Sequence, residues 1–140
     1  MSLQTLLDES HVTIAYDRVN EWLYVDWHGD QNLTSVQHGG QEMLRLLQEC
    51  RCCKVLNDNT GVTSMWSDAA EWAGKVWFPA MAEAGLQYFA WVYSPYLYSR
   101  LSTDLTLQFT TGQSVVATFD DLETAKTWLA QAVPQVRVRN

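Results

Sequence analysis

Positive charge, long apolar runs and a disulfide framework are all scarce or absent in this sequence. Nine Lys and Arg residues stand against sixteen Asp and Glu residues, which gives a formal net charge of −7. This balance repels nucleic-acid phosphates and anionic membrane surfaces, so we expect neither as a partner. No run of about 18 apolar residues is present, which argues against a transmembrane helix. The opening MSLQTLLDES lacks the basic and apolar segments of a signal peptide, so we expect a cytoplasmic protein.

Cysteine is limited to Cys50, Cys52 and Cys53, whose odd number and crowding exclude an ordinary disulfide framework. Cys50 and Cys53 have the CxxC spacing of zinc and redox sites, but a zinc site needs two further ligands and no second pair follows. A redox CxxC normally opens a helix, where the dipole activates the thiol, whereas this one closes a helical pattern. We interpret the thiols as structural and predict no metal site and no cofactor.

The sequence is rich in apolar and aromatic side chains. Hydrophobic residues make up 47% of the chain, with seven Trp, six Tyr and four Phe. The length of 140 residues suits one domain, and the absence of repeats and linkers supports a single domain over residues 1–140. A core of this size does not easily hide so many aromatic rings, which favours a partner or a ligand.

Alternating apolar residues predict a β-hairpin at the start of the chain. Residues 12–16 and 22–27 alternate around the turn at residues 17–20. A helix is expected from near Thr34, which forms a capping box with Gln37, to near Cys50. Within it, Gly39 and Gly40 would let the helix lie close to a sheet.

The rest of the chain alternates between strands and helices. A strand over residues 54–58 leads through a loop over residues 58–68 to a helix over residues 67–84, which we expect Pro79 to kink and Gly85 to cap. A strand over residues 86–93 precedes a helix opened by Ser94 and Pro95. Residues 105–112 fit either the end of that helix or one arm of a hairpin. A strand follows over residues 115–119.

The final helix is expected to begin at Asp120, with Glu123 completing a capping box, and to stop at Pro134. The tail over residues 135–140 fits either an edge strand or irregular structure. The complete order predicts an α/β fold: a mixed sheet of about five strands, with an N-terminal hairpin and then parallel strands, flanked by about four helices.

This order resembles the STAS fold of anti-sigma factor antagonists, and it is most similar to small stand-alone bacterial STAS-like proteins. Three stretches carry the resemblance: KVLNDNTGVTSMWSDAAEW, LQYFAWVYSP and VATFDDLETAKTWLAQ. In the antagonists, a loop with an Asp-Ser-Ser-Gly motif carries a serine that a kinase phosphorylates. On that pattern Trp66, Ser67, Asp68 and Ala69 occupy the four positions. The resemblance thus places Asp68 at the phosphorylated serine, where its charge would imitate the phosphorylated state.

The loop after the central strand is the predicted recognition site, since open α/β folds bind ligands at the carboxyl ends of their strands. The candidate residues for a protein partner or small ligand are Asp58, Asn59, Thr60, Ser64, Trp66, Ser67, Asp68 and Ser94. A simpler interpretation makes Ser67 an N-cap and Asp68 a favourable first-turn charge. The favoured hypothesis is a non-enzymatic binding or regulatory module.

Three further hypotheses concern other residues. A carrier of a small apolar or lipid-like ligand would hold it between helices and sheet with Trp66, Trp77 and Trp91. An enzyme would use Asp58, Ser64 and His28, but these form no recognised catalytic motif. A homodimer would associate through Trp72, Phe78 and Met81, unless the Pro79 kink turns Phe78 inward.

Overall fold

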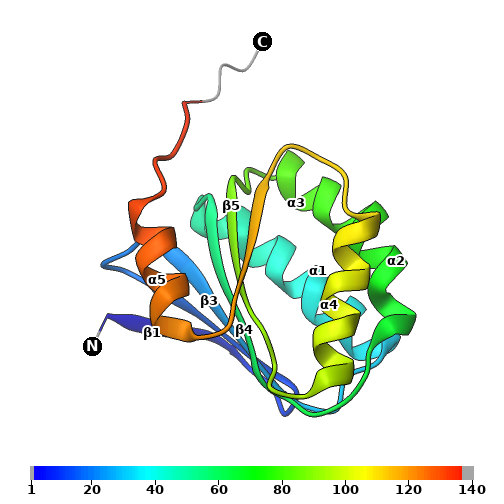
Figure 1. Cartoon of the computed structure of the whole chain (residues 1–140). Helices are drawn as coiled ribbons and strands as arrows, with labels where there is room; N and C mark the ends of the chain where they lie inside the picture. The colour runs from blue at the N-terminus through cyan, green and yellow to red at the C-terminus, as the bar shows by residue number, and fades with distance from the viewer. Residues whose placement is uncertain (1, 137–140) are drawn as a thin grey trace.

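Six strands form one sheet at the centre of the structure, a computed structural model that describes residues 2–136 (Figure 1). The strands follow one another across the sheet in chain order. They are β1 (Leu3–Asp8), β2 (Val12–Asp17), β3 (Trp22–Gly29), β4 (Lys54–Val62), β5 (Tyr88–Val92) and β6 (Val115–Phe119). The first three pair antiparallel, and β3 to β6 pair in parallel. The predicted mixed sheet, with a hairpin first and parallel strands afterwards, is confirmed.

Strand β1 is the sixth strand, which the sequence pattern did not reveal. It pairs only with β2, and the register of this pair shifts between Thr5 and Leu7. Such a bulge interrupts the alternation of faces, so Leu6 and Leu7 follow each other and are both partly buried. The period-two signal that identifies a strand in a sequence is therefore missing.

Helices cover the two faces of the sheet unequally. The segments on one side are α1 (Leu33–Cys50), a helical stretch over residues 67–83 and α4 (Leu97–Phe109), whereas α5 (Leu122–Gln131) lies alone on the other side (Figure 1). The core under α5 consists of Trp22, Leu56, Ala90, Val92, Ala125 and Leu129. Trp22 is thus buried beneath α5. The larger core lies between the sheet and the first group of helices.

The helical stretch over residues 67–83 changes its winding along its length. It consists of η1 (Ser67–Ala69), α2 (Ala70–Trp72), the π-helical turn η2 (Ala73–Trp77) and α3 (Phe78–Glu83). Pro79 lies in the first turn of α3, where its missing N–H costs least. The π turn adds a residue and rotates everything after it, so the kink that we predicted at Pro79 is realised as a bulge before it.

Because of that rotation, the exposed side chains of this segment differ from those predicted. Phe78 and Met81 were expected to be exposed enough to contact a second copy, but they are 2% and 0% exposed. Val76, by contrast, is 55% exposed. Trp72 is partly buried. Phe78 and Met81 therefore offer no surface for a dimer in this fold.

Three helix starts differ from the sequence-based expectation. The cap of α1 is Asn32, which forms a capping box with Ser35, in place of Thr34 and Gln37. The cap of α5 is Asp121 in place of Asp120, and it accepts a hydrogen bond from Thr124. Helix α4 begins at Leu97 after Tyr96. For α1 and α5, several cap-forming residues lie close together in the sequence, so composition alone did not select the one used.

Strand and helix ends also needed correction. Strand β4 continues to Val62, so residues 59–62 belong to a strand and not to the predicted loop. Helix α4 extends to Phe109, which settles the open choice for residues 105–112 as mainly helix. Gly85 ends α3 with a φ of 119°, as expected of a helix-capping glycine.

The tail prediction is only partly covered by the described residues. Residues 135 and 136 lie in no strand, and residues 137–140 are outside the described part. Within residues 2–136, no helix combines the length and apolar character needed to cross a membrane.

Candidate ligand-binding site

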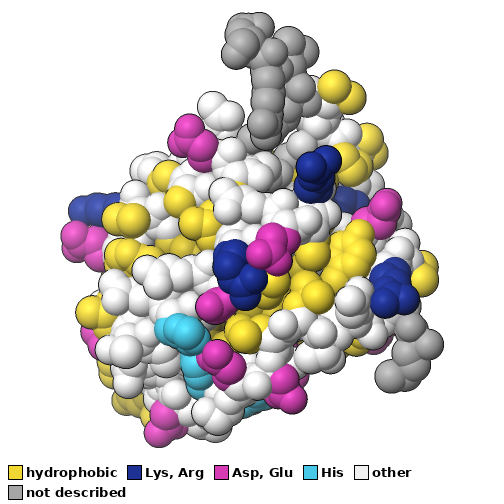
Figure 2. Space-filling view, turned by 180° about the vertical axis from the view of Figure 1, so that it is seen from behind, with side chains coloured by type: hydrophobic (Ala, Val, Ile, Leu, Met, Phe, Trp, Pro, Cys, Tyr) yellow, Lys and Arg dark blue, Asp and Glu magenta, His cyan; other side chains and the backbone are white. Residues whose placement is uncertain are grey.

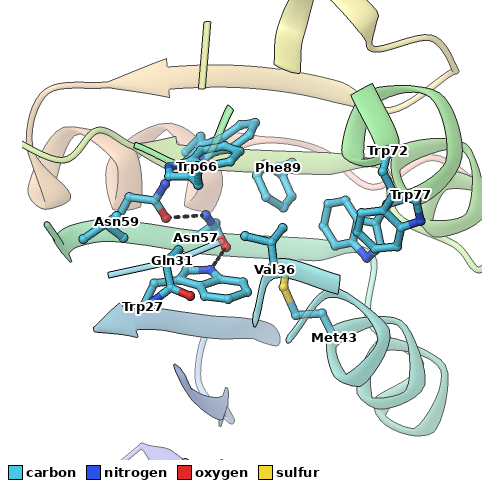
Figure 3. A pocket seen from close by; sticks show the side chains of 12 residues that line it. Trp27, Gln31, Val36, Met43, Asn57, Asn59, Trp66, Trp72, Trp77 and Phe89 are labelled. Atoms are coloured by element: carbon cyan, nitrogen blue, oxygen red, sulfur yellow. Dashed lines mark hydrogen bonds between the residues drawn. The ribbon is translucent and has the colours of Figure 1, made fainter. Parts of the chain in front are cut away.

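A cavity of about 50 Å³ lies between the sheet and the helices of its larger core (Figure 3). Strands β3, β4 and β5 form its floor, and α1, α2 and η2 contribute to its walls. Its lining residues are Trp27, Gln31, Val36, Met43, Asn57, Asn59, Val62, Trp66, Trp72, Trp77, Phe89 and Trp91. Five of these twelve are tryptophan, and none is charged. A small cavity with aromatic walls and a few polar groups has the composition of a ligand pocket.

Two glycines of α1 create the space for the indole rings. A Cβ atom at Gly39 would overlap the ring of Trp27, and one at Gly40 would lie 2.9 Å from Nε1 of Trp77. The N–H of that indole donates a hydrogen bond of 2.7 Å to the carbonyl oxygen of Gly40. The glycine pair therefore lets the helix lie close to two tryptophans, which confirms the sequence-based expectation of close packing.

Buried amides form a polar edge along the cavity. The Trp27 indole N–H donates to Oδ1 of Asn57 at 2.9 Å, and the Asn57 amide nitrogen donates to Oδ1 of Asn59 at 3.1 Å (Figure 3). Gln31 donates to the carbonyl oxygens of His11 and His28. These bonds fix the rings and amides of the wall in position before any ligand enters.

One polar atom of the cavity wall lacks a partner. Trp91 is 5% exposed, and its Nε1 has no hydrogen-bond partner within residues 2–136. By contrast, the indole N–H of Trp66, which stacks on Trp91 with a 6.0 Å centroid separation, donates to Oγ of Ser99 at 3.1 Å. A buried donor without an acceptor costs about 1–3 kcal/mol. Trp91 would therefore gain from an acceptor in the cavity.

Most of the cavity lining is buried. Ten of the twelve lining residues are buried, and the two that are partly exposed are Val36 on α1 and Trp72 on α2. The volume of about 50 Å³ has room for roughly three or four water molecules, or for one compact ligand. A lipid chain needs a larger space, since pockets for drug-sized ligands measure about 300–1,000 Å³.

The predicted recognition loop is divided between the two faces of the sheet. Asn59 and Trp66 line the cavity, and so does the unpredicted Asn57. Asp58 points to the opposite face, because successive strand residues alternate. There it accepts a hydrogen bond of 2.7 Å from the Tyr24 hydroxyl and two further bonds from Thr60. The sheet therefore separates Asp58 and Thr60 from Trp66, with which the sequence pattern had grouped them.

The remaining loop candidates mainly hold the fold together. Ser64 exchanges hydrogen bonds with the backbone of Gln31, and Asp68 accepts one from the N–H of Leu33 at the start of α1. Ser94 is fully buried and donates to the carbonyl oxygen of Val62. Ser67 is partly exposed and begins η1 without acting as its side-chain cap. These bonds join the loop to the start of α1, and the end of β4 to the segment before α4.

The residues of the enzyme hypothesis do not share one site. Ser64 bonds to Gln31, whereas Asp58 lies beside Tyr24 and Asp26 on the face toward α5. Burial, and then the hydrogen bond to Asp58, raises the pKa of the Tyr24 hydroxyl. Burial also raises the pKa of the Asp26 carboxyl, although His28 opposes this. The grouping of Ser64 with Asp58 and His28 has no geometric support.

The cysteines have the surroundings expected of structural thiols. Cys52 is buried, whereas Cys50 and Cys53 are partly exposed. Burial raises the pKa of the Cys52 thiol to about 12, which keeps it protonated and unreactive at neutral pH.

A separate apolar surface lies on the first half of α4. A groove of about 310 Å³ is bordered by Met65, Tyr98 and Leu101, each about half exposed. Leu97, one helical turn before Leu101, is 59% exposed. We call these four residues the α4 patch. No sequence pattern indicated this patch, because apolar residues are not concentrated on one face of α4.

Comparisons with known proteins include a structural likeness. No family model matches the chain, and no curated protein matches it. A crystal structure of an uncharacterised protein of the DUF3478 family, from Shewanella loihica PV-4, is described as having a SpoIIAA-like fold. It is 18% identical in sequence, with a TM-score of 0.48, and covers 89% of this chain and 98% of that one. The SpoIIAA-like fold of that protein is STAS-like.

Proposed function

We propose that this protein is a non-enzymatic binding protein for a small, compact and largely apolar ligand with one hydrogen-bond acceptor. The ligand would occupy the tryptophan-lined cavity. The observation that carries the proposal is the unpartnered Nε1 of Trp91 in the wall of that cavity. This choice develops the carrier hypothesis, with a ligand smaller than a lipid.

The chemistry of the wall defines the ligand. Aromatic faces and the side chains of Val36 and Met43 favour an apolar body, and the absence of charged lining residues disfavours an ion. The Trp91 N–H offers one donor, which suits a carbonyl or ether oxygen. Asn57 is already bonded to Trp27 and Asn59, so it contributes less to recognition.

A pair of matched probes tests this assignment. Cyclopentanone and methylenecyclopentane have similar shapes, but only the ketone carries an acceptor. We expect calorimetry to show that the wild-type protein binds the ketone about 3- to 10-fold more tightly, the value of one net hydrogen bond. In Trp91→Phe, which keeps an aromatic ring and loses the N–H, the two probes should bind equally. An unchanged preference in Trp91→Phe, or no saturable binding by the wild type, would contradict the proposal.

The α4 patch supports a second proposal, self-association. Four apolar side chains gather beside a groove, and such surfaces on soluble proteins commonly mark interfaces. This patch takes the place of the buried Phe78 and Met81 as the surface for a homodimer. Ligand binding and self-association are compatible, since α4 does not line the cavity.

Leu101→Glu should convert a dimer into a monomer. The change places a charge at the centre of the α4 patch, where burial against a second copy would be costly. Multi-angle light scattering of the wild type and the variant measures the mass directly. Val19→Glu, at an exposed position in the turn between β2 and β3, is the matched control and should leave the mass unchanged. A wild-type protein that is already monomeric would rule out this interface.

A further inference from the structure

Three side chains with potential metal-ligand atoms meet beside Trp27, and none of the three lines the cavity. Glu9 and His11 lie in the turn between β1 and β2, and His38 lies on α1. Each offers one ligand atom, and these atoms all lie within 4.8 Å of one another. Figure 2 shows histidine side chains next to acidic ones on the face opposite to the view of Figure 1.

The backbone holds both parts of this cluster in place. The carbonyl oxygen of His11 accepts hydrogen bonds from the backbone N–H of His28 and from the side chain of Gln31. The N–H of Glu9 donates to the carbonyl oxygen of Val12. On α1, the residue after His38 is Gly39, which packs against Trp27. The cluster is therefore built on anchored elements and does not depend on a free loop.

Contacts within the chain satisfy only part of this cluster. Nε2 of His38 lies 2.7 Å from Oε1 of Glu9, so these two groups already share a hydrogen bond or an ion pair. Nε2 of His11 is buried and has no hydrogen-bond partner among residues 2–136. Its ring centre is 5.6 Å from that of His38. Buried polar atoms nearly always have hydrogen-bond partners. The contact between Glu9 and His38 does not provide one for Nε2 of His11.

We propose that Glu9, His11 and His38 bind one zinc ion, with the fourth position of a tetrahedral site open to water. Two imidazole nitrogens and one carboxylate oxygen form a ligand set that zinc accepts. Imidazole ligands favour zinc and other transition metals over Mg²⁺ and Ca²⁺, which prefer oxygen. The ion would replace the hydrogen bond between Glu9 and His38 and would give His11 a partner. It would also join the β1–β2 turn to α1.

Calorimetric titration of the metal-free full-length chain with zinc chloride tests the site. We expect one ion per chain. A residue that only orients a metal ligand typically changes metal affinity by about 10- to 100-fold when it is replaced. Glu9 and His38 are proposed as direct ligands, so His38→Ala and Glu9→Gln should each weaken zinc binding by about 100-fold or more. His38 is exposed, so its replacement leaves the fold intact. His28→Ala is the matched control, because His28 interacts with Thr13 and Asp26 outside the cluster, and it should bind zinc like the wild type.

Cobalt separates this site from the cysteines, which are the competing zinc ligands. Cobalt(II) at the proposed site should give visible ligand-field bands without the intense near-ultraviolet band of a thiolate complex. The spectrum should persist when Cys50 and Cys53 are changed to serine. A thiolate band, loss of binding in that double variant, or full zinc affinity in His38→Ala would each overturn the proposal. None of these outcomes bears on the cavity, so the two proposals fail independently.

Discussion

Gly39→Ala is expected to lower the free energy of unfolding by about 1–3 kcal/mol, the usual cost of overfilling a packed core. A Gly→Ala change within an exposed helix normally raises stability by up to about 1 kcal/mol. The sign of the change in the free energy of unfolding therefore shows whether Gly39 is tightly packed. The reversal follows from the overlap between a Cβ atom at Gly39 and the ring of Trp27. That ring cannot move freely, because its N–H is bonded to Asn57.

Urea unfolding of the wild type and Gly39→Ala measures this effect. Gln41→Ala, at an exposed position on the same helix, is the control and should change stability by a few tenths of a kcal/mol at most. Equal or greater stability of Gly39→Ala would mean that α1 and Trp27 are further apart than described. The geometry of the cavity would then have to be revised as well.

Val36→Phe should remove ligand binding while it preserves or raises stability. Phenylalanine has four more side-chain carbon atoms than valine, and Val36 lies at the partly exposed mouth of a cavity of about 50 Å³. Filling an existing cavity typically contributes about 0.5–2 kcal/mol. The ring would occupy the space that the ligand needs, so cyclopentanone should show no saturable binding.

Val76→Phe provides the matched control for this experiment. Val76 is 55% exposed on the π turn, so the same substitution there leaves the cavity unchanged. It should keep the wild-type affinity for cyclopentanone. Loss of binding in both variants would point to a general disturbance of the fold, and retained binding in Val36→Phe would place the ligand elsewhere.

The architecture was largely predictable because its signals are local. The alternation in β2 and β3, the apolar run of β5 and the cap-like residues before α1 and α5 each identify an element within a few residues. The order of these elements then predicts a sheet with both antiparallel and parallel strands. The signals failed where local rules are broken: at the bulge in β1 and at the π turn before Pro79, after which Phe78 is buried and not exposed as expected.

The sites were less predictable, because they depend on contacts between distant parts of the chain. Trp66 and Trp91 were proposed as cavity residues, but Trp27 and Gln31 were missed since they belong to other elements. One sequence signal did exist: Asn57 and Asn59 are two positions apart in a buried strand, and buried polar side chains need hydrogen-bond partners. Glu9 and His38 are separated by 29 positions, so no spacing rule could have joined them.

The indole proton resonance of Trp91 gives the most direct test of the proposed cavity. Its disappearance in Trp91→Phe assigns it among the seven tryptophan signals. We predict that cyclopentanone shifts this resonance downfield in a saturable manner, as a new hydrogen bond requires, and that methylenecyclopentane produces no such shift. A Trp91 signal that is insensitive to the ketone, at concentrations where the other cavity indoles respond or where none does, would contradict the assignment of this cavity as the binding site.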